Sequence, residues 1–393
     1  MAFLDTIGAT AYGITSIGTP LALVMKRCFG ARKTVFIGVS AISLGTALTG
    51  TVDHPEEMFM TYGIMVGCGT LLANNPPWFL LSEYFTKDHK YYVLTSSLPT
   101  LSFSLGSLIF NPCTQALIHS IGWRNTYAFI SILTFVVGMS AMATFRENGE
   151  PKVAQQEAPS SGDGQSSNED DSNSGAVEPL ANPPIWLVLV SGSVYVLSMG
   201  LRSMALFTPV FILVKHLQNL GVASMSAAAV VTIYSTADLC GRLFTSLLGD
   251  KLFKGRIMYV NIVCSVLLGL ENFAAGFAVQ YYQMVIFALV AGFTAGLMSA
   301  GIFASSSEVL DGWYAHEIFS FSRVGNGIGV IVGLGLSGFI YDLTGSYHLV
   351  YHLNLGVFLL AGTGYGITIL LRNRKLRNRS TDNSEHIPLN SSK

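Results

Sequence analysis

The chain has 393 residues, of which 50% are hydrophobic and only 11% are charged. Soluble domains carry about 25% charged residues, so this composition excludes an ordinary soluble fold and indicates a polytopic membrane protein. The net charge of −1 leaves no basic excess, which argues against a nucleic-acid partner. The five cysteines are scattered singly, so they form no Cys-x-x-Cys metal site and argue against a disulfide framework.

Apolar stretches long enough to cross a bilayer as helices recur along the whole chain. Their apolar residues run continuously rather than alternating, which excludes a transmembrane β-barrel. The predicted fold class is therefore an all-α integral membrane bundle. We expect eleven spans, at residues 7–25, 34–52, 58–82, 93–118, 124–145, 185–214, 223–248, 256–277, 280–307, 320–341 and 348–371.

The positive residues orient these spans, because Lys and Arg gather on the cytosolic side of membrane proteins. Most of the 22 Lys and Arg residues fall on the side that carries residues 146–184 and the C-terminus. Arg124 and Lys215 fall on the opposite side, and Arg202 and Arg242 lie within spans. The pattern predicts a multi-pass protein whose linker and C-terminus are cytosolic and whose Met1 faces outside.

The segment SSGDGQSSNEDDSNSG at 160–175 interrupts the hydropathy pattern. It is acidic, of low complexity and without aromatic residues, so it has too little apolar surface to fold. The chain is expected to divide into an N-terminal lobe of five spans, a disordered acidic cytosolic linker, a C-terminal lobe of six spans and a basic cytosolic tail, at 1–145, 146–184, 185–371 and 372–393.

A short internal repeat supports the two lobes. In the N-terminal half, the first and second spans are joined by LVMKRCFGARKTV at 23–35. In the C-terminal half, the second and third spans are joined by LLGDKLFKGRIMYV at 247–260. Aligning Gly30 with Gly255 superposes the two turns. Parallel repeats of this kind build transporters that bind substrate near the midplane, between the lobes.

Several motifs carry a resemblance to a known family. They are YFTK at 84–87, GWR at 122–124, ADLCGR at 237–242, Glu308, and YDLTGSY at 341–347. With these motifs the chain resembles the monocarboxylate transporter family of the major facilitator superfamily, over nearly its whole length except the linker and the tail. The resemblance implies a plasma-membrane location and a single-span immunoglobulin-like chaperone as a partner. The residues matched to family motifs are Tyr84, Phe85, Lys87, Gly241 and Glu308.

Two departures from the family pattern bear on the substrate. Residues 1–52 resemble the family's second and third helices, so the first helix, with its substrate lysine, is absent and the N-terminal lobe corresponds to family helices two to six. After YFTK, Asp88 and His89 stand where the family has basic residues. This pattern resembles an orphan branch more than the lactate carriers.

Asp238 and Arg242 are the sharpest candidate pair for transport. They stand at positions i and i+4, so they share one helix face near the middle of a span. A lone charge there costs from about 2.5 to more than 10 kcal/mol, so such residues face the bundle interior or a wet cavity. Arg242 can hold a carboxylate and Asp238 can take a proton, roles that the resemblance also implies. The alternative is a structural ion pair between helices.

Two further residues are candidate substrate contacts. Arg202 lies within a span, where it could line the pathway or reach towards water. Asn74 precedes Asn75, Pro76 and Pro77, a run that breaks helical hydrogen bonds. This run either lines a cavity or forms a satisfied kink. The glycines Gly325, Gly329 and Gly333 are interpreted as a packing surface between helices.

The functional prediction is proton-coupled symport of a small monocarboxylate by alternating access, with a small organic anion and a proton as partners. No GxxxxGK[ST] motif and no catalytic histidine motif is present, so we expect neither ATP drive, nor a cofactor, nor a metal, nor an enzyme. One alternative is a facilitative carrier of a neutral or zwitterionic metabolite, such as an aromatic amino acid or creatine. Another is a truncated, non-transporting isoform.

Overall fold

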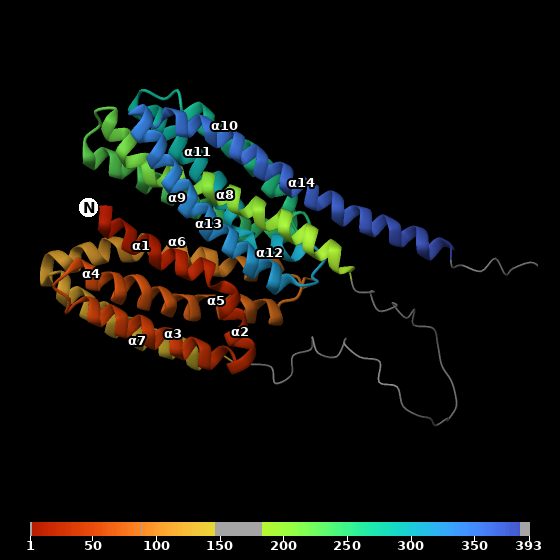
Figure 1. Cartoon of the computed structure of the whole chain (residues 1–393), viewed down its shortest axis with the longest axis horizontal. Helices are drawn as coiled ribbons and strands as arrows, with labels where there is room; N and C mark the ends of the chain where they lie inside the picture. The colour runs from red at the N-terminus through yellow and green to blue at the C-terminus, as the bar shows by residue number, and fades with distance from the viewer. Residues whose placement is uncertain (1, 88, 146–182, 386–393) are drawn as a thin grey trace, which may run out of the picture.

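A computed structural model describes residues 2–87, 89–145 and 183–385, and every regular element in these ranges is a helix. The helices form two bundles that lie side by side, one built from the N-terminal half of the chain and one from the C-terminal half (Figure 1). The predicted disordered linker lies outside the described residues, apart from its last two. Residues 386–393 of the predicted tail lie outside them as well.

Glycines mark most boundaries in the N lobe. Gly30 and Gly122 have φ of 85° and 80°, values that favour glycine, and each separates two helices. Pro20 starts a new helix after Gly18, which breaks the predicted span 7–25. The N-lobe elements are α1 (Ala2–Ile17), α2 (Thr19–Phe29), α3 (Ala31–Thr49), α4 (Pro55–Met58), the π-helix η1 (Phe59–Val66), α5 (Gly67–Tyr84), α6 (Tyr92–Ile121) and α7 (Trp123–Ala143).

The C lobe differs from expectation at two boundaries. Gly301 divides the predicted span 280–307 into two helices. The last helix does not end with the predicted span at residue 371 but continues to Glu385. The elements are α8 (Ile185–Asn219), α9 (Ser224–Leu252), α10 (Ile257–Ala275), α11 (Tyr281–Ala300), α12 (Ile302–Glu308), α13 (Ala315–Thr344) and α14 (His348–Glu385).

Seven of the described helices are long and apolar enough to cross a membrane: α6, α7, α8, α10, α11, α13 and the His348–Arg374 part of α14. The other four predicted spans are helical but shorter, interrupted or more polar. They correspond to α1 with α2, to α3, to η1 with α5, and to α9. All eleven predicted spans are thus helical and follow in the predicted order, but only seven of the described helices are by themselves long and apolar enough to cross a membrane.

The C lobe is organised around α8, which packs against α13 and α14. A Cβ on Gly329 would overlap the carbonyl oxygen of Gly200, and one on Gly325 would lie 2.5 Å from that of Val196. The backbones of α8 and α13 therefore touch, which confirms the predicted packing role of the span-ten glycines. The main cluster of buried apolar residues lies almost entirely in this lobe.

The N lobe is less enclosed. Here α3 packs against α5 and α7, whereas the chief partner of α6 is α9 of the other lobe. Phe103 of α6 and Ile132 of α7 are 67% and 65% exposed. Apolar surface all around a helix is typical of a membrane segment. Because its chief partner is α9, α6 belongs by sequence to the N lobe but packs at the boundary between the two lobes.

Candidate functional site

Asp238 and Arg242 form an ion pair on α9. The Nε of Arg242 donates to Oδ2 of Asp238 at 2.7 Å, and Nη2 donates to Oδ1 at 3.2 Å. Each side chain is only 14% exposed. The i, i+4 spacing predicted that the two side chains meet, and the bidentate geometry confirms it.

The backbone beside this pair is fixed by a close helix crossing. A Cβ on Gly241 of α9 would overlap the carbonyl oxygen of Phe293, and one on Gly296 of α11 would overlap that of Asp238. Both positions therefore need glycine, because only hydrogen leaves room for the neighbouring main chain. The motif residue Gly241 thus sets the position of α9 against α11 and has no side chain to offer a substrate.

The opposite lobe completes the surroundings of the pair. Ser104 of α6 donates its hydroxyl to Oδ2 of Asp238 at 3.0 Å, and Nη1 of Arg242 donates to the carbonyl oxygen of Thr100 at 3.3 Å. The sequence analysis missed both partners. The available signal was weak: Ser97, Thr100 and Ser104 follow at helical spacing on one face of α6. The ion pair consequently lies at the boundary between the lobes.

Arg202 lies apart from this pair, in the interior of the C lobe. Its side chain is 1% exposed. Nη2 donates to the hydroxyl of Ser299 at 3.0 Å and Nη1 to the sulfur of Met199 at 3.6 Å, while no ion pair involving Arg202 occurs among the described residues. A buried cation with neutral partners is costly, so Arg202 is suited to meet an anion.

The Asn-Asn-Pro-Pro run lies within α5. Asn74 is exposed, whereas Asn75 is buried and donates its amide to the carbonyl oxygen of Leu71 at 2.9 Å. Asn75 also accepts a hydrogen bond from Thr19 of α2 at 3.4 Å. The structure therefore assigns the helix contact to Asn75 and leaves Asn74 facing outward from the packed interior.

The remaining motif residues lie at or just after the ends of α12 and α5. Lys87 pairs with Asp311 of the other lobe at 3.0 Å. Glu308 is 2% exposed, and its carboxylate accepts the backbone N–H groups of Ile257 and Met258, each at 3.0 Å. Glu308 thus caps the first turn of α10. These positions serve lobe contact and helix capping.

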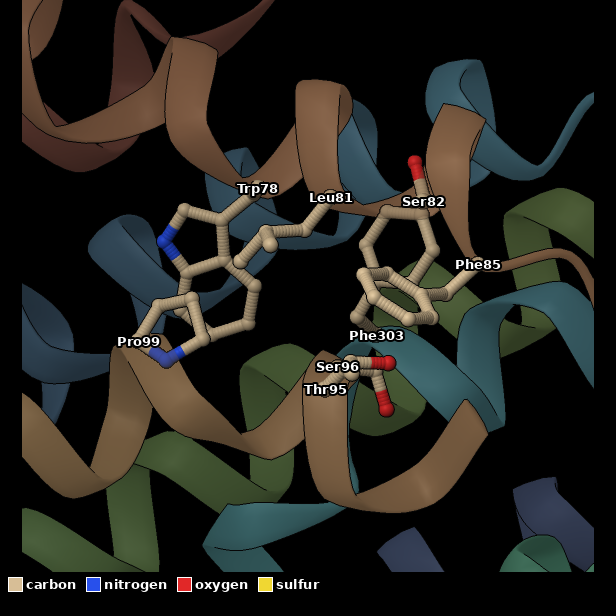
Figure 2. Close-up of a pocket in the computed structure, with 8 residues that line it drawn as sticks. All are labelled: Trp78, Leu81, Ser82, Phe85, Thr95, Ser96, Pro99 and Phe303. Carbon is tan, nitrogen blue, oxygen red and sulfur yellow. The ribbon is translucent and has the colours of Figure 1, made fainter. Parts of the chain in front are cut away.

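Tyr84 and Phe85, also from the YFTK motif, lie at the end of α5. Tyr84 is 42% exposed, and the ring of Phe85 packs edge-on against His89, with centroids 4.9 Å apart. Figure 2 shows Phe85 among the residues that line a small pocket between α5, α6 and α12. Its lining is Trp78, Leu81, Ser82, Phe85, Thr95, Ser96, Pro99 and Phe303. The lining carries no charged side chain, so this pocket does not suit an organic anion.

Comparisons with known proteins agree with this architecture. A family model described as Major Facilitator Superfamily matches residues 1–278 and 218–391. Rat "Monocarboxylate transporter 13" is 25% identical over 366 residues, which cover 92% of this chain and 79% of that protein.

Two solved structures share the fold. The human organic anion transporter MFSD10 has a TM-score of 0.69 at 14% identity, covering 91% of this chain and 82% of that one. The fucose:proton symporter FucP of E. coli has a TM-score of 0.62 at 14% identity, covering 93% and 90%. The predicted two-lobed helical fold is thereby confirmed. Since the family match extends over both lobes, the chain belongs to the Major Facilitator Superfamily and is a multi-pass membrane transporter.

Proposed function

We propose that the protein is a proton-coupled symporter of a small monocarboxylate, and that Asp238 and Arg242 are its coupling pair. The observation that carries this proposal is the largely buried, bidentate ion pair at the boundary between the lobes. Its similarity to proteins named as monocarboxylate transporters, as an organic anion transporter and as a proton symporter supports the proposal.

The chemistry follows from the donors and acceptors of the pair. Two donors of Arg242 are engaged by the carboxylate of Asp238. A proton on Asp238 removes the negative charge that holds them, and Arg242 then offers the same bidentate geometry to the carboxylate of a substrate. The site thus binds one proton with one anion, which avoids carrying an uncompensated charge through the membrane.

Alternating access requires the lobes to separate at one end while they meet at the other. In this structure they are joined near the linker, where Lys87 pairs with Asp311 and Arg27 with Glu317. We place that end, together with the linker and the C-terminus, in the cytosol, and the protein in the plasma membrane. The structure described here is then the state closed to the cytosol.

Within this proposal Arg202 and Asn74 are further substrate contacts. Arg202 is a buried cation within a membrane helix and lacks an acidic partner among the described ion pairs. Asn74 is exposed outside the packed interior of its lobe, so its amide can reach the pathway only if the pathway runs along that face of α5. A partner chaperone, implied by resemblance alone, stays a prediction.

The test is uptake of radiolabelled L-lactate, pyruvate and acetate into proteoliposomes at several pH values. We expect acid-stimulated uptake by the wild type, loss of the pH dependence in Asp238→Asn, and a decrease of about a hundredfold in Arg242→Lys, which keeps the charge but not the bidentate geometry. Asp342→Asn, an exposed carboxylate on α13, is the matched control. If Asp238→Asn takes up these acids with the same pH dependence as the wild type, the proposal is refuted. Exchange of neutral solutes by the wild type that does not depend on pH would favour the facilitative alternative.

A further inference from the structure

Four contacts join α6 to α9 across the boundary between the lobes, and we call them the α6–α9 ladder. Asp250 accepts the backbone N–H groups of Val93 and Leu94 at 2.7 and 3.1 Å. The other three contacts follow along both helices towards the middle of the membrane: the hydroxyl of Ser97 to that of Ser246 at 2.7 Å, Arg242 to Thr100 at 3.3 Å, and Ser104 to Asp238 at 3.0 Å.

The spacing makes the ladder continuous. On α9 the contacting residues recur every four positions, and on α6 every three to four, so each set shares one helix face. One end of the ladder is the capped N-terminus of α6, near the linker. The other end is the ion pair. A change at Asp238 is therefore connected, through one uninterrupted row of contacts, to the end at which the lobes are closed.

We infer that Ser104 is a positioning residue that holds α6 to the ionised form of Asp238, so that uptake of a proton there releases the two lobes from one another. This inference rests on the proposed function. The inference adds Ser104, a residue of the opposite lobe, whose hydrogen bond depends on whether Asp238 carries a proton.

The donors and acceptors support this role. Oδ2 of Asp238 accepts from both Ser104 and Arg242. Hydrogen bonds to an ionised acceptor are about twice as strong as neutral ones. A proton on the carboxyl group turns the Ser104 contact into a neutral one. It also removes the attraction that fixes the Arg242 side chain, which makes the neighbouring ladder contact to Thr100.

The surroundings of Asp238 contain few other charges that could take over this role. Arg242 and Tyr234 belong to its own helix, and Glu271 of α10 lies near Tyr234. From α6 the nearest groups are the Ser104 hydroxyl and the Thr100 carbonyl, and from α11 the backbone at Gly296. The side of Asp238 that faces the N lobe is thus occupied by a neutral donor.

Pro99 gives α6 a place to bend between the two parts of the ladder. It lies inside the helix and has no N–H to donate to the carbonyl of Thr95, so the helix is weakened there. Ser97 lies on one side of this position and Thr100 on the other. Release of Thr100 and Ser104 can therefore move the part of α6 beyond Pro99 first, before the contacts of Ser97 and of the capped end separate.

The experiment measures lobe separation without substrate. Spin labels at positions 120 on α6 and 225 on α9, both exposed and at the ends away from the linker, report the distance between the lobes in nanodiscs as a function of pH. The test variant is Ser104→Ala, and Ser104→Thr keeps the hydroxyl. The control is Ser102→Ala, because the exposed hydroxyl of Ser102 donates to the carbonyl oxygen of Pro99 on its own helix.

We expect a pH-dependent change of distance in the wild type. Ser104→Ala should move its midpoint to higher pH by about one unit, because the lost hydrogen bond favours the charged form. Ser104→Thr and Ser102→Ala should keep the wild-type midpoint. An unchanged midpoint in a folded Ser104→Ala protein would overturn the inference.

Asp238→Asn separates this inference from the proposed function. If it abolishes the pH response while Ser104→Ala leaves the midpoint unchanged, the coupling role of Asp238 stands and the role of Ser104 falls. If Asp238→Asn still responds to pH as the wild type does, both fall, and a wild type whose distance is constant from about pH 5 to about pH 8 overturns both as well.

Discussion

The two boundaries between the lobes differ in chemistry. The α6–α9 ladder contains a largely buried ion pair, whereas the contacts of α1 with α13 inside the membrane are neutral. There the phenol of Tyr12 donates to Asn326 at 2.8 Å, and the amide of Asn326 donates to Ser203 at 2.7 Å. A neutral contact of this kind does not change with pH, so of these two boundaries the ladder is the one that contains a carboxylate able to take up a proton. Under the proposed function, the other boundary is a constant contact about which the lobes move.

The same difference is present near the linker. Aligning the two repeats at Gly30 and Gly255 places Met25 at the position of Asp250. Asp250 caps the N-terminus of α6, whereas the N lobe makes its contact with α13 through Arg27 and Glu317. The repeat thus preserves the shape of the turn but not the charge that closes the boundary.

Of the following changes, removing the Asp250 cap should have the largest effect on the ratio of closed to open molecules. Asp250→Asn loses the charge-assisted bonds to the first turn of α6, a loss of about 2 kcal/mol, or roughly thirtyfold in the ratio of closed to open molecules. Spin labels at positions 90 and 251, both exposed near the linker, should show a longer distance. Asp342→Asn should leave the distance distribution unchanged, and an equally closed Asp250→Asn would contradict the assignment.

Disrupting the neutral boundary should have a smaller effect of a different kind. Asn326→Ala removes the contacts with Tyr12 and Ser203, at a cost of about 1 to 2 kcal/mol in stability. The pH midpoint of lobe separation should stay at the wild-type value, because these contacts include no carboxylate and no other charged group. Tyr12→Phe should behave in the same way at about half the cost. A midpoint shift as large as that of Ser104→Ala would contradict the comparison.

The Arg27–Glu317 pair should have the smallest effect. Arg27 is 56% exposed, and exposed ion pairs contribute at most about 1 kcal/mol, which salt screens further. Arg27→Gln should therefore lower the thermal unfolding temperature slightly in dilute buffer and not at all at high ionic strength. A large decrease that is independent of salt would show that Arg27 has a further structural role.

Much of the fold could be predicted because hydropathy reports directly on burial in a membrane. The helix breaks at Gly18 and Gly301 were missed, since an apolar stretch looks the same whether or not its backbone is interrupted. The end of α14 was missed for the opposite reason. Hydropathy marks where residues cease to be apolar, near residue 371, and not where the helix ends, at Glu385.

The candidate site was predictable only in its local part. The contact of Asp238 with Arg242 follows from helical spacing, which is fixed within one segment. Ser104 and Asp250 were not recognised, because their partners are 134 and about 157 residues away in the chain and no local pattern predicts that α6 packs on α9. The distinction between Asn74 and Asn75 likewise depends on how α5 is rotated against α2.

The glycine crossing beside the ion pair bears on substrate selectivity. Since the main chains of α9 and α11 touch at Gly241 and Gly296, neither helix can shift to make room for a longer or branched anion. The opposite wall, on α6, consists of the small residues Thr100 and Ser104. If Arg242 binds the substrate carboxylate as proposed, the length and branching of the acid are then limited from the side of the N lobe, and the affinity for its carboxylate is set from the side of the C lobe.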